Sequence, residues 1–214
     1  DGLRAGPEAE AEAARRAECV GVAEAFQWPF GRKTVVRREA NLGLVGQWLA
    51  AWEPDMAGPD DGPAVLILED DLELSPLFWR WLKLMRREYG GREDLAGISL
   101  QHQHHRCDTS STDLWVDNGP QPYLYRVPGS WGFAPARRPW ARFLAWQRAA
   151  AARGDEPDDV TYRGRLVCTS QMWRTWRAEG RDPKMWTAWY LSFMRSEGLL
   201  CLYPNLPGGA GFAA

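Results

Sequence analysis

The sequence predicts an α/β fold, in which helices pack against a sheet of short strands. Segments with apolar residues at helical spacing alternate along the chain with short apolar runs rich in β-branched residues, a pattern typical of an α/β sandwich. One of these runs, residues 64–68, is continuously apolar, which predicts a central parallel strand buried on both faces. The length of 214 residues suits one domain, and the sequence has no visible internal repeat.

Apolar periodicity and helix-start signals place the elements of the first half of the chain. A helix is expected to begin with Ser75 as its N-cap and Pro76 as its first helical residue, and to end before Gly90. The other elements expected here are helices at residues 8–26 and 41–52 and strands at residues 34–36, 64–68 and 95–100.

The second half of the chain opens with a long polar loop, residues 101–122, of a length that is usually functional or mobile. Five large apolar residues then recur at helical spacing near the end of the chain and predict an amphipathic helix: Trp186, Trp189, Tyr190, Phe193 and Met194. The remaining expected elements are strands at residues 123–127 and 199–203, a tight turn at 128–132, a helix at 137–152 and a short helix around 172–176.

Composition excludes some functions and raises one question. A net charge of −2 argues against a general nucleic-acid binder, and no apolar run approaches the roughly 18 residues needed to span a membrane. Four cysteines form no close pair, so disulfides and free thiols both remain possible. Thirteen tryptophans are far more than usual; some are expected in the core, and others as flat surfaces on which sugars or bases stack.

Three adjacent carboxylates, Glu69, Asp70 and Asp71, follow the predicted central strand without a spacer. They therefore lie at the carboxyl end of a strand, where open α/β sheets bind ligands. Half-buried carboxylates repel one another unless they are paired, and Mg²⁺ or Mn²⁺ relieves this because these ions prefer oxygen ligands. The alternative is an acidic surface turn whose charges are solvated.

A basic junction precedes the acidic strand. Arg37 and Arg38 follow the expected strand at 34–36, and Asn41 and Gly43 open the next helix. If the two strands are parallel neighbours, this junction and the acids open on the same edge of the sheet. Arginine, an amide, a helix N-terminus and a metal together suit a diphosphate. Without the acids, a solvated arginine pair would be the better interpretation.

Three histidines, His102, His104 and His105, lie within four residues of the long loop. Neighbouring residues of an extended loop cannot all point at one ion, and the chain has no further histidine to complete a zinc shell. These histidines are therefore expected to be polar loop residues or acceptor contacts.

The acidic segment resembles a known motif. Residues 65–76, Val-Leu-Ile-Leu-Glu-Asp-Asp-Leu-Glu-Leu-Ser-Pro, are similar to the metal-binding DxD segment of GT-A-fold glycosyltransferases, in its Glu-Asp-Asp form. This form is that of the N-acetylglucosaminyltransferase I type and related glycosyltransferase family 2-like eukaryotic proteins. The resemblance covers about residues 20–206, and the other segments that agree in order are Trp28–Gly31, Arg37 with Asn41–Leu44, Gly97–Leu100, Pro122–Tyr125, Ser130–Gly132 and Leu202–Asn205.

The resemblance implies a three-layer α/β/α sandwich and a transferase that moves a sugar from a nucleotide diphosphate to a glycan, protein or lipid acceptor. Asp71 would bind Mn²⁺ or Mg²⁺, which holds the diphosphate, while Asp70 would contact the ribose and Glu69 would shape the donor pocket. Arg37 and Asn41 would contact the donor. Ser130, Trp131 and Gly132 match the turn that borders donor sugar and acceptor. Relatives of this kind are luminal Golgi proteins behind a membrane anchor.

The chain also departs from that family. The first βαβ unit, which holds the base, and a trailing histidine segment have no counterpart, so residues 1–214 are expected to be one GT-A-like domain truncated at both ends. The aspartate that serves as general base in inverting relatives has no counterpart in Trp186–Trp189; Asp182 and Glu197 flank that stretch and are the candidate substitutes. The isolated segment is therefore expected not to transfer sugar.

Two other functions stay open on the sequence. One is a catalytically silent GT-A-like module that binds a glycan or a partner protein. The other is a metal-dependent phosphoesterase, which would normally need carboxylates and histidines from several strand ends. Only one acidic cluster is visible in the sequence, and this disfavours the phosphoesterase.

Overall fold

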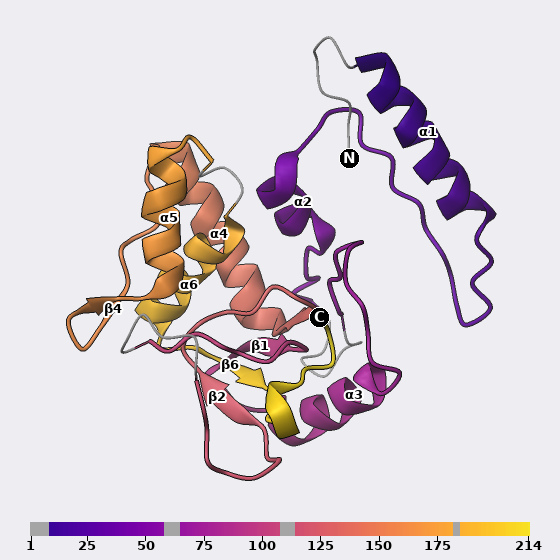
Figure 1. The fold of residues 1–214 in the computed structure, drawn as a ribbon. Helices are drawn as coiled ribbons and strands as arrows, with labels where there is room; N and C mark the ends of the chain where they lie inside the picture. Colours follow the sequence, from indigo (N-terminus) through magenta and orange to yellow (C-terminus); the bar gives the residue numbers. More distant parts are fainter. Residues whose placement is uncertain (1–8, 58–64, 108–113, 182–184) are drawn as a thin grey trace.

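The computed structural model describes residues 9–57, 65–107, 114–181 and 185–214 (Figure 1). Its centre is a mixed four-stranded sheet with the order β2-β6-β1-β3. The strands β1 and β6 are parallel, and β3 and β2 flank them in the antiparallel direction. The strand bounds are β1 Leu95–Ser99, β2 Tyr123–Tyr125, β3 Phe133–Pro135 and β6 Leu200–Tyr203.

Helices cover both faces of this sheet, so the fold is a three-layer α/β arrangement (Figure 1). On one face, Ile98 and Leu202 pack against Leu82 of α3. On the other face, Phe133 and Tyr203 pack in a second cluster with residues of α2, α4 and α6. The helix bounds are α1 Ala9–Ala25, α2 Gly43–Ala51, α3 Phe78–Tyr89, α4 Arg137–Arg153, α5 Cys168–Ala178 and α6 Trp186–Glu197.

Aromatic side chains fill the larger of the two clusters. Trp140, Tyr190 and Phe133 are fully buried, and their ring centroids lie 5.3–6.3 Å apart. The Tyr190 hydroxyl donates a hydrogen bond to the Ala96 carbonyl at 2.7 Å, which joins α6 to β1. Gly97 leaves room for this packing, because a Cβ there would lie 2.4 Å from the Phe133 ring. The core therefore accounts for much of the tryptophan content.

The expected helices are confirmed. All five apolar residues expected on the face of α6 lie in the aromatic cluster or pack against it. The helix α3 begins at Phe78 rather than at Pro76, and the Ser75 N–H is bonded to the Phe212 carbonyl at 3.0 Å. The Ser75 hydroxyl still accepts a hydrogen bond from the Leu77 N–H at 3.3 Å. The expected helix at 172–176 is longer than its apolar residues indicated and begins at Cys168.

The predicted central strand at residues 64–68 is wrong. Ala64 lies outside the described residues, and residues 65–69 form only one isolated bridge, in which Ile67 pairs with Phe133 of β3. This pairing is antiparallel and lies at the edge of the sheet, so the segment has one neighbour instead of two. Leu68 is consequently 40% exposed, and the acidic residues follow an edge segment rather than a central parallel strand.

The predicted strand at residues 34–36 is also wrong. Residues 32–38 have no regular secondary structure and return along α1, beside the main body of the fold (Figure 1). The Lys33 ammonium group donates to three carbonyls at the end of α1, at 2.6–2.8 Å, and Arg16 donates to the Arg38 carbonyl at 2.6 Å. These contacts, rather than a sheet partner, hold the segment.

Two further features complete the fold. A hairpin of β4 (Thr161–Tyr162) and β5 (Arg165–Leu166), which the sequence pattern did not indicate, precedes α5. All four cysteines are free thiols, which decides the alternative left open by the sequence. None of the described helices is both long and apolar enough to cross a membrane.

Candidate functional site

The bridge between Ile67 and Phe133 brings two of the predicted site segments together. The two residues exchange hydrogen bonds between their backbones, with N–O distances of 2.9 and 3.1 Å. Because the pairing is antiparallel, Glu69 and Trp131 each lie two residues beyond the bridge in the same direction. The acidic turn and the turn that carries Trp131 therefore lie at one end of the sheet, the end where β1 stops.

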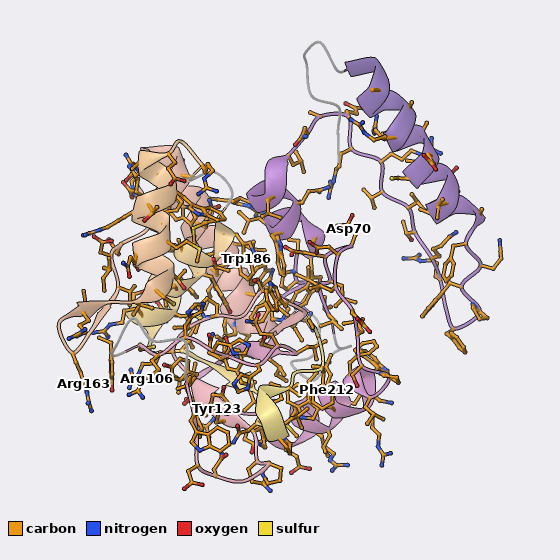
Figure 2. The ribbon with its side chains drawn as sticks, viewed as in Figure 1. Asp70, Arg106, Tyr123, Arg163, Trp186 and Phe212 are labelled. Carbon is orange, nitrogen blue, oxygen red and sulfur yellow. The ribbon has the colours of Figure 1, made fainter. Side chains whose placement is uncertain are left out.

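Within the acidic turn the three carboxylates have different surroundings. Glu69 is half-buried and accepts a hydrogen bond from the Trp48 indole N–H at 2.7 Å. Trp48 in turn stacks on Trp186, with ring centroids 4.2 Å apart. Asp70 and Asp71 are exposed at the turn, and Figure 2 shows the position of Asp70. The three acids therefore do not form the expected cluster of unpaired, half-buried carboxylates. Glu69 is hydrogen-bonded, and Asp70 and Asp71 are solvated.

A divalent cation fits this turn only with ligands from outside the protein. Among the described residues, no group of three or more His, Cys, Asp or Glu side chains could hold a metal ion. However, Mg²⁺ is commonly bound by one or two carboxylates, with water and substrate phosphates as the other ligands. Asp71 is exposed and available for this kind of attachment.

Backbone pairing fixes the chain on both sides of the acidic turn. The bridge at Ile67 precedes it, and Glu73 pairs after it with Ala214, with N–O distances of 2.9 and 3.1 Å in the two directions. Phe212 anchors this second pairing, because its ring stacks on Trp81 of α3 at 4.9 Å. The two aspartates are therefore presented from a turn with both ends held, which suits a binding site better than a free loop.

The turn that carries Trp131 is held by a side chain that the sequence did not single out. The amide oxygen of Gln101 accepts hydrogen bonds from the backbone N–H groups of Ser130 and Trp131, at 2.8 and 2.9 Å. Gly132 has φ +70°, which favours glycine, and its carbonyl accepts a bond from the Leu100 N–H at 2.8 Å. Trp131 is 46% exposed, so it is not a core residue; its place at the wall of a pocket stays a prediction.

Replacing Trp131 with alanine is expected to change the free energy of unfolding by no more than about 0.5 kcal/mol, because surface side chains contribute little to stability. Ligand binding at this end of the sheet should weaken instead, since the stacking surface is removed. Chemical denaturation and calorimetric titration measure the two effects. Trp79, which is 41% exposed on α3, provides a matched control as Trp79→Ala. A stability loss of about 3 kcal/mol or more would assign Trp131 to the core.

The histidines of the long loop serve mainly in packing beside this turn. His102 is buried, and its ring meets that of His104 edge-on at 4.8 Å. Burial, and secondly the neighbouring His104, lowers the pKa of His102 below its ordinary value, and the same two causes lower the pKa of His105. Between them, Gln103 donates a hydrogen bond to the Tyr203 hydroxyl at 3.1 Å and so ties the loop to β6.

These lowered pKa values predict how stability depends on pH. A histidine with a lowered pKa in the folded state binds fewer protons there than in the unfolded chain, whose histidines titrate near pH 6.5. The free energy of unfolding should therefore be highest above about pH 6.5 and fall as the pH decreases through the lowered pKa values. Protonation at Nδ1 of His102 adds to this cost, because that buried atom has no hydrogen-bond partner among the described residues.

Urea denaturation at several pH values between about 5.5 and 7.5 measures this slope in a range where carboxylates titrate little. The double variant His102→Gln/His105→Gln should show a shallower slope than the original protein. An unchanged slope would assign the pH dependence to other groups.

The structure does not bring Arg37 to the acidic turn by the route that the sequence suggested. The strand expected before it is absent, and the Arg37 guanidinium forms an ion pair with Glu24 of α1. Asn41 accepts a hydrogen bond from the N–H of Gly43, the first residue of α2, at 2.7 Å. Trp48, further along α2, connects this part of the chain to the acidic turn through its hydrogen bond to Glu69. Donor contacts by Arg37 and Asn41 stay predictions.

Of the two candidates for the missing base, only Glu197 lies in the described part of the chain, and it is not at the acidic turn. Asp182 lies outside the described residues. Glu197 ends α6 and forms an ion pair with Arg142. The first turn of α6 carries no acidic residue, although Trp186 places this helix start directly against Trp48. Glu197 lies at the other end of α6, about 16 Å from Trp186 along a helix that rises 1.5 Å per residue.

Comparisons with protein-family models, with curated proteins and with solved structures found no match. Fold and site therefore define the class of this protein: an α/β protein with a mixed sheet, in which an acidic turn and a turn with an exposed tryptophan lie at the end of the sheet where β1 stops.

Proposed function

We propose that this protein is a metal-dependent glycosyltransferase of the GT-A fold, which transfers a sugar from a nucleotide-diphosphate donor to a glycan, protein or lipid acceptor. One observation carries the proposal: the Ile67–Phe133 bridge holds the acidic turn and the Trp131 turn at the same end of the sheet. These two segments are 60 positions apart in the chain, and each resembles a donor-site element of that family. By the same resemblance, the expected location is the Golgi lumen.

The metal ion, Mn²⁺ or Mg²⁺, would stabilise the negative charge that develops on the leaving nucleotide diphosphate. Asp71 would hold that ion from its exposed position, and Asp70 would accept hydrogen bonds from the ribose hydroxyls. Glu69 is bonded to Trp48, and this contact fixes the direction in which the turn leaves the sheet. The acidic turn thus has one anchored carboxylate and two that are free to meet a donor.

The Trp131 turn would form the wall on the sugar side of the same site. An exposed indole offers a flat apolar surface, against which the apolar face of a sugar ring can stack. Gln101 fixes the Ser130 and Trp131 N–H groups, so the ring is positioned before a ligand arrives. Such preorganisation reduces the free-energy cost of ordering side chains on binding.

The proposal is tested by calorimetric titration of the protein with uridine and guanosine diphosphates and with their sugar-linked forms, each with and without Mn²⁺. Binding of at least one of them should require the metal and should weaken in Trp131→Ala only when a sugar is attached to the diphosphate. Metal-independent binding, or no binding of any nucleotide or nucleotide sugar, would contradict the proposal.

A second candidate function is a catalytically silent GT-A-like module that binds a glycan or a partner protein. The observation that favours it is the start of α6, where the first turn carries no carboxylate near the Trp48–Trp186 stack. An inverting transferase needs a general base near the acceptor, and its removal typically costs about 10²–10⁴-fold in rate. Glycan binding that needs neither nucleotide nor metal would favour this second function.

A further inference from the structure

Gln101 leaves the sheet at the carboxyl end of its parallel pair of strands. It follows β1 by two residues, and β1 and β6 run parallel in the middle of the sheet. Open α/β sheets bind ligands outside the carboxyl ends of such strands. The register of β1 with β3 pairs Ser99 with Phe133 and, continued by two residues, places Gln101 opposite Trp131. Gln101 therefore lies at the same end of the sheet as the candidate site.

Gln101 and the acidic turn lie on opposite sides of Trp131. The segment that contains Ile67 pairs with β3 along one edge and β1 pairs with β3 along the other, so Glu69 and Gln101 both lie level with Trp131. Neighbouring strands are about 4.7–4.9 Å apart, so about 10 Å separates the two backbones. A ligand with its phosphates at the acidic turn and its sugar on Trp131 therefore meets Gln101 with the sugar.

The side-chain amide of Gln101 has a fixed orientation. Its oxygen, Oε1, accepts hydrogen bonds from the Ser130 and Trp131 N–H groups at 2.8 and 2.9 Å. An NH₂ group in this place would bring two further donors to two N–H donors. Gly129 leaves room for the contact, since a Cβ there would lie 2.9 Å from Oε1. The NH₂ group of Gln101 is consequently directed away from the Trp131 turn.

This NH₂ group has no use within the described part of the chain. It donates a hydrogen bond to none of the described residues, and it is not one of their buried unpartnered atoms, so solvent reaches it. Gln101 as a whole is only half-buried. Ligand sites contain a few polar groups of this kind, which are held in place and which fix the orientation of the ligand.

The two sides of Trp131 offer opposite chemistry. The ionised carboxylates of Asp70 and Asp71 only accept hydrogen bonds, whereas the NH₂ group of Gln101 only donates them. A ligand group at Gln101 must therefore bring an oxygen with a lone pair. An ammonium group has donors only, and a deoxy position has neither donor nor acceptor. A site that is built to bond a substrate group rejects analogues that lack this group.

We propose that Gln101 determines the specificity of this site by donating a hydrogen bond from its side-chain NH₂ group to an oxygen of the sugar that stacks on Trp131. This role rests on the proposed transferase function, because that function places the sugar at Trp131. Gln101 thus has two tasks, since its oxygen holds the turn and its nitrogen selects the sugar. Sugars with an oxygen at the contacted position are accepted, and those with hydrogen or an amino group there are rejected.

Two variants separate the two tasks. Gln101→Glu keeps an oxygen for the Ser130 and Trp131 N–H groups but replaces the donor by a second acceptor, whereas Gln101→Ala removes both. Hydrogen exchange of these two amides should stay slow in Gln101→Glu and become faster in Gln101→Ala. Equal exchange in Gln101→Ala and the original protein would contradict the fixed orientation of the Gln101 amide.

Sugar selection is measured by calorimetric titration with Mn²⁺. The ligands are the nucleoside diphosphate, its sugar-linked form, and derivatives of that form in which hydrogen or an amino group replaces one hydroxyl at a time. Each affinity is divided by that of the nucleoside diphosphate for the same variant, so that the added negative charge of Gln101→Glu cancels. In the original protein, both derivatives of at least one position should bind about three- to tenfold more weakly, as expected for one hydrogen bond.

The variants should change the preference at that one position. In Gln101→Ala the difference between the hydroxyl form and the deoxy form should disappear, which is the coupling that a double-mutant cycle measures. In Gln101→Glu the amino derivative should bind at least as tightly as the hydroxyl form, because a carboxylate accepts hydrogen bonds from an ammonium group. A purely structural role of Gln101 would not reverse the preference.

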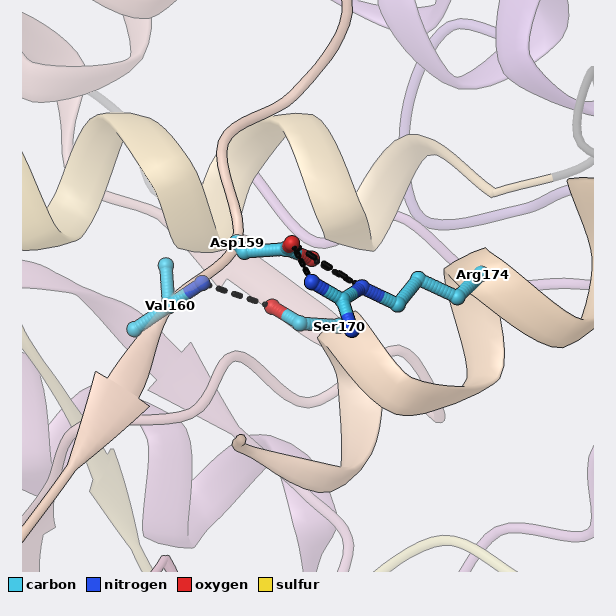
Figure 3. A network of polar contacts seen from close by, with 4 residues as sticks. All are labelled: Asp159, Val160, Ser170 and Arg174. Carbon is cyan, nitrogen blue, oxygen red and sulfur yellow. Dashed lines mark hydrogen bonds and ion pairs between the residues drawn. The ribbon is translucent and has the colours of Figure 1, made fainter. Parts of the chain in front are cut away.

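Ser170→Ala is the matched control. The Ser170 hydroxyl also supports the backbone, by accepting a hydrogen bond from the Val160 N–H at 3.0 Å next to the β4–β5 hairpin (Figure 3). Figure 2 shows Arg163, at the tip of that hairpin, on the opposite side of the molecule from Asp70. This variant should lose stability but bind every ligand with the preference of the original protein.

The results distinguish the role of Gln101 from the proposed function. If the original protein shows no metal-dependent binding of a nucleoside diphosphate, the function is contradicted and the role of Gln101 with it. If the diphosphate binds with Mn²⁺, but both Gln101 variants keep the sugar preference of the original protein, only the role of Gln101 is overturned.

Discussion

Replacing Asp71 with asparagine is expected to abolish the Mn²⁺-dependent binding of a nucleoside diphosphate. The substitution keeps the size of the side chain and removes the negative charge that would hold the metal. Loss of a hydrogen-bond partner behind a metal ligand costs about 10–100-fold in metal affinity, so loss of the ligand itself should cost at least about 100-fold. Calorimetric titration with and without Mn²⁺ measures the change.

The fold should survive this substitution, because Asp71 is exposed and such positions contribute about 0.5 kcal/mol or less to stability. Asp155→Asn provides the matched control, since Asp155 is exposed, lies after α4 and pairs with Arg153. The control should bind the nucleotide normally. Asp70→Asn should weaken binding less than Asp71→Asn does. If Asp71→Asn and the original protein bind the nucleoside diphosphate with equal metal-dependent affinity, Asp71 is not the metal ligand.

The largest effect on stability is expected for Trp140→Ala. Trp140 is fully buried, its ring contacts those of Phe133, Phe143 and Tyr190, and its indole N–H donates to the Trp52 carbonyl at 3.1 Å. Removal of a buried tryptophan leaves a cavity and typically costs about 3–5 kcal/mol. The carbonyl of Trp52 would also lose its partner. Urea denaturation should therefore show a much lower midpoint.

Trp79→Ala is again the control, because it removes the same side chain from an exposed position. Its midpoint should stay close to that of the original protein. A loss of less than about 1 kcal/mol in Trp140→Ala would show that the aromatic cluster is not the centre of stability.

The helices were predictable because the buried face of each one requires apolar residues at a regular spacing in the sequence. In α6, Trp186, Tyr190 and Phe193 recur at the helical period and all three are buried against the sheet. The same period recurs in α3, where Leu82 and Met85 pack under the other face of the sheet. A period of 3.6 residues over several turns is a strong signal, since it depends on many side chains at once.

Short apolar runs were poorer guides. Residues 64–68 and 34–36 have the composition of strands, but a strand also needs a partner, and partners are set by the tertiary fold. Ile67 has a single neighbour, Phe133, at the sheet edge. The segment at 34–36 packs along α1 instead of joining the sheet. Conversely, β4 and β5 are two residues each, too short to leave a period in the sequence.

The two turns of the candidate site could be singled out from the sequence, but the contacts that support them could not. Adjacent carboxylates and a tryptophan between small turn residues are unusual in sequence, and both segments proved to lie at one end of the sheet. The supports did not stand out, because Gln101 and Trp48 carry no motif. Their roles depend on distances to Ser130 and Glu69 that exist only in the folded chain.

The most direct test of the proposed site is the position of the metal itself. Crystals grown with Mn²⁺ and the nucleoside diphosphate that binds best should show an anomalous manganese peak within direct coordination distance of the Asp71 carboxylate. The diphosphate should lie between that peak and the Trp131 turn. A manganese peak held by other side chains, with Asp71 facing solvent and the nucleotide elsewhere, would contradict the proposal.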